Sequence, residues 1–140
     1  MRVLLSIKPE FAEKIFAGEK HFEFRRRIFR SDDVHSAIVY SSSPVRSIIG
    51  EFEIDGLLKA CPSDIWAETK ATAGITREFF EAYFAGRDIA YALVIGKRRR
   101  YQTPIKPKAH NPSFVAPQSY RYVGSGEARK WLQINEPAIG

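Results

Sequence analysis

The order of strand-like and helix-like segments constrains the fold of this chain more than any other feature of its sequence. Segments with strand character outnumber those with helix character, and the two kinds do not alternate. A doubly wound parallel sheet requires alternation, so this order argues against such a fold. We therefore expect an α+β fold, in which a small, mixed or antiparallel, partly closed β-barrel carries helices at its ends.

Strands are predicted where apolar residues run together or alternate with polar residues. Arg2–Ile7 is a short apolar run, and in Glu19–Arg27 the two phenylalanines share one face. Similar patterns predict further strands over Ala37–Tyr40, Ile48–Asp55, Asp88–Ile95 with an extension through Lys97–Tyr101, and Ser119–Val123.

Helices are predicted in three places before the last strand. The first carries Phe11–Phe16 and ends at Gly18, the second starts near Pro62, and Thr76 caps the third. The third helix has an aromatic stripe that is typical of a buried face, so we assign all of its rings to the core. The stripe consists of Phe79, Phe80, Tyr83 and Phe84.

The part of the chain that follows residue 102 is rich in proline. Prolines at positions 104, 107, 112 and 117 predict that most of residues 103–117 lack regular structure. A short helix is expected over Ser125–Leu132.

Length and cysteine content indicate the class of protein. A chain of 140 residues fits one domain, residues 1–140, with a core that needs no disulfide. Cys61 is the one cysteine, which suits a reducing compartment. The first apolar run stops at Lys8-Pro9, too short for a signal peptide or a membrane span. We expect a cytoplasmic protein with no membrane association.

Positive charge is concentrated in two parts of the sequence. Residues 1–30 hold eight Lys/Arg and four Glu, and residues 89–126 hold seven Lys/Arg and no acidic residue. The whole chain has a net charge of +6. Segregated positive charge attracts polyanions, so RNA or a nucleotide is the expected partner; a solvated basic face without a partner is the alternative.

The densest polar cluster follows the first predicted helix and contains Lys20, Glu23, Arg25 and Arg27. Arg binds phosphate through paired hydrogen bonds, and a carboxylate between cations can accept a hydrogen bond from a base. Strict alternation puts Lys20 on the opposite face, so it joins Glu23 only if the strand starts after residue 20. An exposed strand with salt bridges explains the same spacing equally well.

Two weaker clusters are further candidates for nucleic-acid contact. Tyr40, Ser41 and Ser42 introduce a turn whose hydroxyl and N–H groups can bind phosphate or a base edge, although an ordinary turn would look the same. In the basic run that starts at Lys97, Arg99 and Tyr101 share a face and could hold a single strand. A charged edge strand is the alternative there.

Metal and cofactor motifs are absent from the sequence. The three histidines are scattered, and with one cysteine they give no metal-ligand spacing. The chain has no Walker loop and no GxGxxG or GxSxG motif. We therefore expect neither a metal nor a cofactor.

Several segments together resemble the ASCH domain, the activating-signal-cointegrator homology family of the PUA-like superfamily. They are SIKPEFAEKIFAGEKHFEFRRR, IVYSSSPVRSIIGEFEI, IWAETKATAGITREFFEAYFAGRDIAYALVI and PQSYRYV, and the most distinctive feature is GxKxxExR. The resemblance implies a PUA-like β-barrel with a cleft lined by Lys20, Glu23 and Arg25. It places Lys8 at the rim and the Tyr40–Pro44 loop opposite.

The resemblance implies an RNA-binding module, with a role in regulating transcription or translation. Some relatives are enzymes: amidohydrolases that remove the acetyl group of N4-acetylcytidine, or ribonucleases. Lys20 matches the catalytic Lys of the amidohydrolases, but Glu23 stands where they have a Thr nucleophile. If the chain is an enzyme, Lys20 and Glu23 are the expected catalytic residues. A protein-interaction module is the third possibility and would need an exposed apolar patch.

Overall fold

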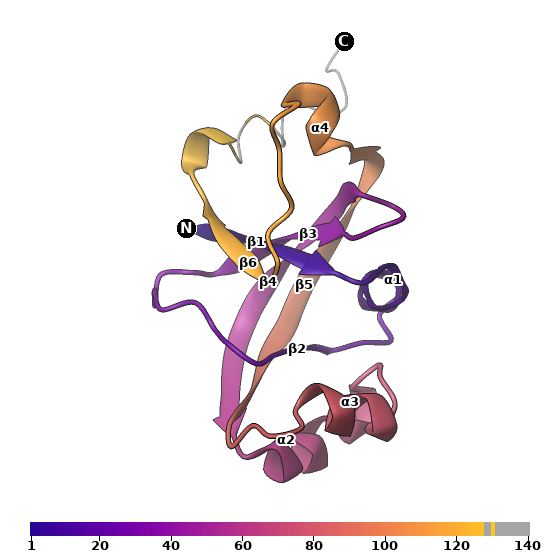
Figure 1. The fold of residues 1–140 in the computed structure, drawn as a ribbon, viewed down its shortest axis with the longest axis vertical. Coiled ribbons are helices and arrows are strands. Elements are labelled where there is room, and N and C mark those ends of the chain that lie inside the picture. The colour runs from indigo at the N-terminus through magenta and orange to yellow at the C-terminus, as the bar shows by residue number, and fades with distance from the viewer. Residues whose placement is uncertain (128–129, 131–140) are drawn as a thin grey trace.

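The fold is a mixed six-stranded sheet with helices packed on it, as the computed structural model describes it for residues 1–127 and residue 130 (Figure 1). The strands are β1 (Arg2–Ile7), β2 (Phe22–Arg25), β3 (Ser36–Ser41), β4 (Ser47–Ala60), β5 (Ala90–Ile105) and β6 (Tyr120–Val123). The helices are α1 (Pro9–Phe16), α2 (Pro62–Thr69), α3 (Arg77–Tyr83) and α4 (Pro107–His110), and a single 3-10 turn, η1 (Lys70–Thr72), follows α2.

The strands form one sheet in the order β2-β5-β4-β3-β1-β6. β1 runs parallel to β3, and the other neighbouring pairs are antiparallel. The predicted α+β class with a mixed sheet and flanking helices is confirmed. Closure into a barrel is not confirmed, because β2 and β6 lie at the two ends of the strand order and the sheet stays open between them.

The helices cover different parts of this sheet. The buried side chains of Ala12 and Ile15 face the core, and α1 packs on β3 and β5. α2 and α3 form an insertion between β4 and β5, at one end of the molecule (Figure 1). Phe80 of α3 packs edge-on against Phe24 of β2, with 5.2 Å between ring centroids. The insertion is thus fixed to the sheet by aromatic packing.

Several strand boundaries differ from the sequence predictions. β4, predicted over Ile48–Asp55, covers Ser47–Ala60. β2 covers only residues 22–25 of the predicted strand Glu19–Arg27, so residues on either side do not follow its alternation. β5 is longer than predicted: it includes Pro104 and ends at Ile105, and Pro107 then starts α4. Proline is tolerated in β5 because the pairing with β4 is irregular there, between the Gly50–Arg100 and Ile48–Ile105 pairs.

The C-terminal helix predicted over Ser125–Leu132 falls partly outside the described residues; residues 125–127 are helical. Within residues 1–127, no helix has the length and apolar character that crossing a membrane requires.

Candidate functional site

A cavity of about 590 Å³ lies where β1, β2, α1, α3 and the segment before β6 meet. Both charged groups and aromatic rings line it, and several of the cations lie against the rings. The residues that line it are Ser6, Ile7, Lys8, Phe11, Lys20, Glu23, Phe24, Arg25, Arg26, Ser42, Ile75, Phe79, Ala82, Tyr83, Ala116, Pro117 and Gln118.

Two glycines shape the chain around Lys20. Gly18 ends α1 with a φ of +80°, and Gly74 of the insertion has a φ of +70°. A Cβ atom on Gly74 would lie 2.5 Å from the Cβ atom of Lys20. Glycine at position 74 therefore allows the insertion to approach Lys20 closely.

Lys20 is buried in this cavity, with 1% of its surface exposed. Its Nζ atom donates to the carbonyl oxygen of Ala73 at 2.9 Å and lies 4.6 Å from the ring centroid of Phe24. Burial lowers the pKa of Lys20 to about 8, although the negative charge of Glu23 opposes the shift. The amine can thus gain or lose a proton near neutral pH.

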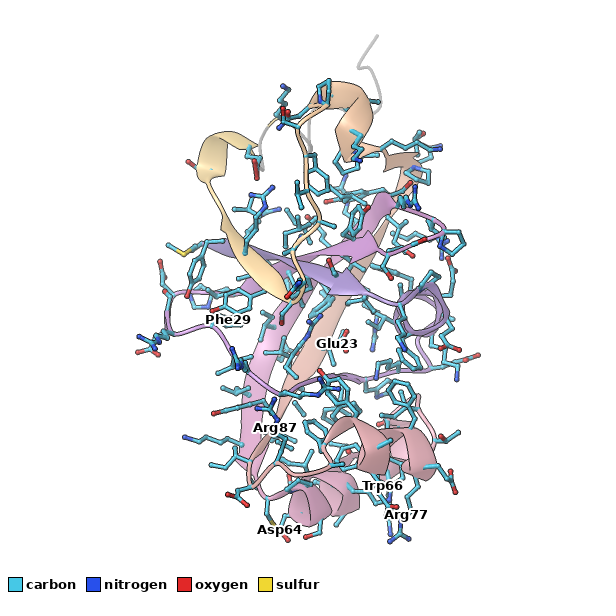
Figure 2. All side chains as sticks on the ribbon, viewed as in Figure 1. Glu23, Phe29, Asp64, Trp66, Arg77 and Arg87 are labelled. Atoms are coloured by element: carbon cyan, nitrogen blue, oxygen red, sulfur yellow. The ribbon has the colours of Figure 1, made fainter. Side chains whose placement is uncertain are left out.

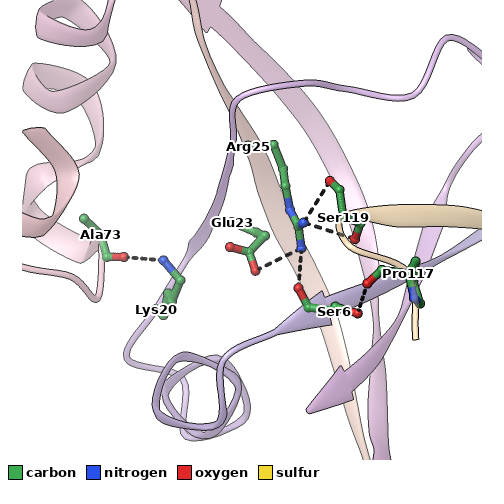
Figure 3. A network of polar contacts seen from close by, with 7 residues as sticks. All are labelled: Ser6, Lys20, Glu23, Arg25, Ala73, Pro117 and Ser119. Carbon is green, nitrogen blue, oxygen red and sulfur yellow. Dashed lines mark hydrogen bonds and ion pairs between the residues drawn. The ribbon is translucent and has the colours of Figure 1, made fainter. Parts of the chain in front are cut away.

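Glu23 lies between Lys20 and Arg25 (Figure 3). Its side chain points toward the middle of the molecule, whereas the labelled Asp64 and Arg77 lie at the periphery (Figure 2). Glu23 is 7% exposed, and its Oε2 atom is buried with no hydrogen-bond partner among the residues that the structure describes. The closest cationic atom to this oxygen, Nη2 of Arg25, is 3.9 Å away. A buried carboxylate oxygen without a donor is costly, so this atom is suited to receive a ligand N–H or O–H.

The guanidinium of Arg25 is held by the protein on its other side. Nη1 donates to the carbonyl oxygen and the hydroxyl of Ser119 at 3.2 and 3.3 Å. Nη2 donates to the carbonyl oxygen of Ser6 at 3.1 Å. Arg25 therefore links β2 to β1 and to the residue that precedes β6.

Three half-buried rings, of Phe11, Phe79 and Tyr83, form an aromatic wall of the cavity. The rings of Phe11 and Phe79 meet edge-on at 5.0 Å, and those of Phe79 and Tyr83 lie nearly parallel at 6.3 Å. Burial raises the pKa of Tyr83, so its hydroxyl is protonated at neutral pH. A flat apolar surface of this kind can stack on a nucleobase.

Two exposed cations, Lys8 and Arg26, form a basic rim next to this wall. Lys8 Nζ lies 5.1 Å from the Phe79 centroid. The Arg26 guanidinium lies 4.2 Å from the Tyr83 centroid and donates through Nε to the Tyr83 carbonyl oxygen at 2.8 Å. The rings hold both cations at the mouth of the cavity.

The structure brings five of the predicted site residues to the cavity. They are Lys8, Lys20, Glu23, Arg25 and Ser42. The condition for Lys20 to join Glu23 is met, because β2 starts at Phe22.

The other predicted site residues lie elsewhere. Arg27 is exposed beyond the end of β2, where alternation no longer applies, and Ser41 is buried in β3. Tyr40 and Tyr101 are core residues with 7% and 4% of their surface exposed, which leaves neither ring free to stack on a base.

Two of the four cations at positions 97–100 of β5 pair with acidic residues. Arg99 pairs with Glu51 at 3.4 Å, and Glu51 also accepts a hydrogen bond from the Tyr101 hydroxyl at 3.0 Å. Arg100 makes two hydrogen bonds with Glu13, at 2.6 and 2.7 Å. The structure places Arg99 and Tyr101 away from the cavity, and their contact with a single strand stays a prediction. Sequence spacing could not show the acidic partner.

Phe79, Tyr83 and Arg26 line the cavity but were not among the predicted site residues. The aromatic stripe of α3 divides: Phe80 and Phe84 are core, as predicted, whereas Phe79 and Tyr83 face the cavity. Helical periodicity could have shown this division. Phe79 and Tyr83 are four residues apart and each precedes one of the core residues Phe80 and Phe84, so they lie about 100° around the helix from them. Across residues 1–127, no group of His, Cys, Asp and Glu side chains is arranged to hold a metal ion.

The lowered pKa of Lys20 predicts a specific dependence of stability on pH. Between about pH 8 and pH 10.5 the unfolded chain binds more protons than the folded chain at this lysine, so folding becomes more favourable as pH rises. Relative to Lys20→Met, the wild-type unfolding free energy should rise by about 3 kcal/mol across this window. Urea unfolding of both proteins at each pH measures the difference, and parallel pH curves would contradict the prediction.

Comparison with known proteins identifies the family. The ASCH domain model matches residues 5–103. An ASCH domain-containing ribonuclease of Zymomonas mobilis is 28% identical over 137 residues, which cover 94% of this chain and 90% of that protein. The large ribosomal subunit protein uL22 of Ureaplasma parvum is 27% identical over 122 residues, 86% of this chain but 39% of that protein.

Solved structures agree with the sequence comparison. The crystal structure of ASCH from Zymomonas mobilis superimposes with a TM-score of 0.89 at 26% identity, over 96% of both chains. The N-terminal domain of Staphylothermus marinus McrB shares the fold alone, with a TM-score of 0.55 at 12% identity over 91% of both chains. With the family model matching more than half of its length, the chain belongs to the ASCH domain family.

Proposed function

We propose that this chain, as one ASCH domain, binds RNA by taking a nucleotide into the cavity, with the base inside and the phosphates at the basic rim. The observation that carries the proposal is the unpartnered, buried oxygen of Glu23 in a cavity that also has an aromatic wall. Family membership and the similarity to a relative named as a ribonuclease support RNA as the ligand. A role in regulating transcription or translation would be exerted through this binding.

The charges inside the cavity favour a base over a phosphate as the buried group. Glu23 can accept a hydrogen bond from an N–H group of a base, whereas its carboxylate would repel a phosphate. Lys20 is next to Glu23 and can donate to a ring nitrogen or carbonyl oxygen of the same base. Every nucleobase presents an acceptor beside an N–H donor on its Watson–Crick edge, so this pair suits a base edge.

The basic rim supplies the phosphate contacts in this arrangement. Lys8 and Arg26 are exposed, and their charged groups contact aromatic rings and, for Arg26, a backbone carbonyl oxygen. Among the described residues, neither forms an ion pair with a carboxylate. Arg27 is exposed next to Arg26 in the sequence and extends the positive surface. Binding should therefore weaken as salt concentration rises.

Stacking on the aromatic wall predicts the effect of a single substitution. Phe79→Leu keeps an apolar side chain but removes the ring, so affinity for a short single-stranded RNA should fall by about 1–3 kcal/mol, roughly 5- to 150-fold in Kd. Fluorescence anisotropy measures the change. Phe29→Leu is the matched control, because Phe29 is half-buried against Tyr120, outside the cavity. Equal effects of the two substitutions would argue against stacking.

Cleavage of RNA is a second candidate function, favoured by the pKa of Lys20 near 8. A neutral lysine can act as general base when its pKa is near the working pH. Cleavage requires a different pose, with the ribose rather than the base next to Lys20. In the simplest scheme, Lys20 takes the proton of a 2′-hydroxyl, the 2′-oxygen attacks the adjacent phosphorus, and the 5′-oxygen leaves with a proton from water. Removal of an acetyl group from a cytidine is less well supported, because Glu23 is not an equivalent of a Thr nucleophile.

This scheme predicts the pH dependence of cleavage. The base form of Lys20 is populated above about pH 8, so the rate should rise with pH and level off above that value. Lys20→Arg, which stays protonated, should abolish cleavage but keep the positive charge. End-labelled RNA analysed on denaturing gels gives the rates. Equal cleavage by wild type and Lys20→Arg would exclude Lys20 as the base.

A further inference from the structure

We propose that Arg25 is a positioning residue, which joins the two ends of the open sheet and holds the Glu23 carboxylate in the cavity, and that it does not bind the phosphates of the ligand. The proposal rests on the RNA-binding function proposed above and assigns Arg25 a different role within it. Spacing alone had suggested a phosphate contact for this residue.

The hydrogen bonds of Arg25 are the first argument. Three of its five N–H donors are used by protein oxygens: two by Ser119 at 3.2 and 3.3 Å and one by the Ser6 carbonyl at 3.1 Å. A fourth, on Nη2, lies beside the Glu23 carboxylate, at 3.9 Å between heavy atoms. The remaining donor, Nε, is buried and has no hydrogen-bond partner among the described residues. A phosphate that used Nη1, or both N–H groups of Nη2, would have to displace these protein oxygens.

The position of Arg25 in the sheet is the second argument. Arg25 is the last residue of β2, at one end of the strand order, whereas Ser6 belongs to β1 and Ser119 precedes β6, at the other end. The carbonyl oxygen of Ser119 also accepts the backbone N–H of Ser6 at 3.2 Å. One guanidinium therefore connects the two ends of the sheet where backbone pairing does not (Figure 3).

The neighbouring carboxylate is the third argument. Arg25 and Glu23 are two residues apart on β2, so their side chains share one face. Each has 7% of its surface exposed. The Arg25 charge faces Glu23 from the side of β1, and the Lys20 charge faces it from the side of the insertion (Figure 3). Loss of Arg25 would free the carboxylate to turn away from a bound base.

The test compares Arg25→Lys and Arg25→Gln with Lys8→Gln, a variant of the basic rim. Affinity for a short single-stranded RNA is measured at several salt concentrations. A lysine keeps the charge but cannot span both ends of the sheet, so both Arg25 variants should lose tenfold or more in affinity with an unchanged salt slope. The salt slope is the slope of the logarithm of the binding constant against the logarithm of the salt concentration. Lys8→Gln should reduce its magnitude by about 0.7, the value for one lost phosphate contact on a single strand. Wild-type affinity in Arg25→Lys, together with a reduced slope in Arg25→Gln, would overturn the proposal.

Hydrogen exchange gives a readout that needs no ligand. The Ser6 amide, bonded to Ser119, should exchange at least tenfold faster in both Arg25 variants, while the Phe52 amide on the central strand β4 keeps its wild-type rate. Unchanged Ser6 protection would overturn the positioning role even if RNA binding were lost. Absence of RNA binding by the wild type would refute the proposed function and leave this second test valid. If Arg25→Gln does not fold, Arg25→Lys supplies both measurements, because its aliphatic stem fills the same space.

Discussion

The buried charges of Lys20, Glu23 and Arg25 are the interaction on which the rest of this structure depends. Burying a charged group is unfavourable unless it is paired and hydrogen-bonded. Here the two cations are compensated by backbone carbonyl oxygens of other segments: Ala73 in the insertion for Lys20, and Ser6 with Ser119 for Arg25. The same contacts that stabilise the charges therefore hold three distant parts of the chain around one cavity.

The buried charge of Glu23 is only partly compensated by neighbouring cations, and this leaves the cavity with a free acceptor for a ligand. Within the described part of the chain, its Oε2 atom lacks a hydrogen-bond donor, and the surrounding rings and cations enclose a space large enough for a base. Leaving a buried acceptor unpaired costs stability, and a site that binds a ligand can recover that free energy on binding. The proposed RNA binding follows from this division: a polar inner end for the base edge, an aromatic wall for its face, and a basic rim for the backbone.

Sequence reasoning reached the fold class and the strand that carries the charges because both depend on local patterns. The alternation around Phe22 and Phe24 located β2, and proline and glycine positions located α1. It could not find the boundary of β2 at Arg25, and so it placed Arg27 beside Glu23. Burial of Tyr40 and Tyr101 and the pairing of Arg99 with Glu51 depend on contacts between distant segments, which spacing does not reveal. The cavity-facing half of the α3 stripe was missed for the same reason: helical periodicity separates two faces but does not say what covers each.

Nuclear magnetic resonance of the isotope-labelled protein with a short single-stranded RNA tests the central claim most directly, because it locates the base. We expect nuclear Overhauser contacts from base protons to the ring protons of Phe79 and Tyr83, and from ribose protons to the side chain of Lys8. Contacts confined to the exposed side chains of residues 97–100 on β5, with the resonances of the aromatic wall unchanged, would contradict it.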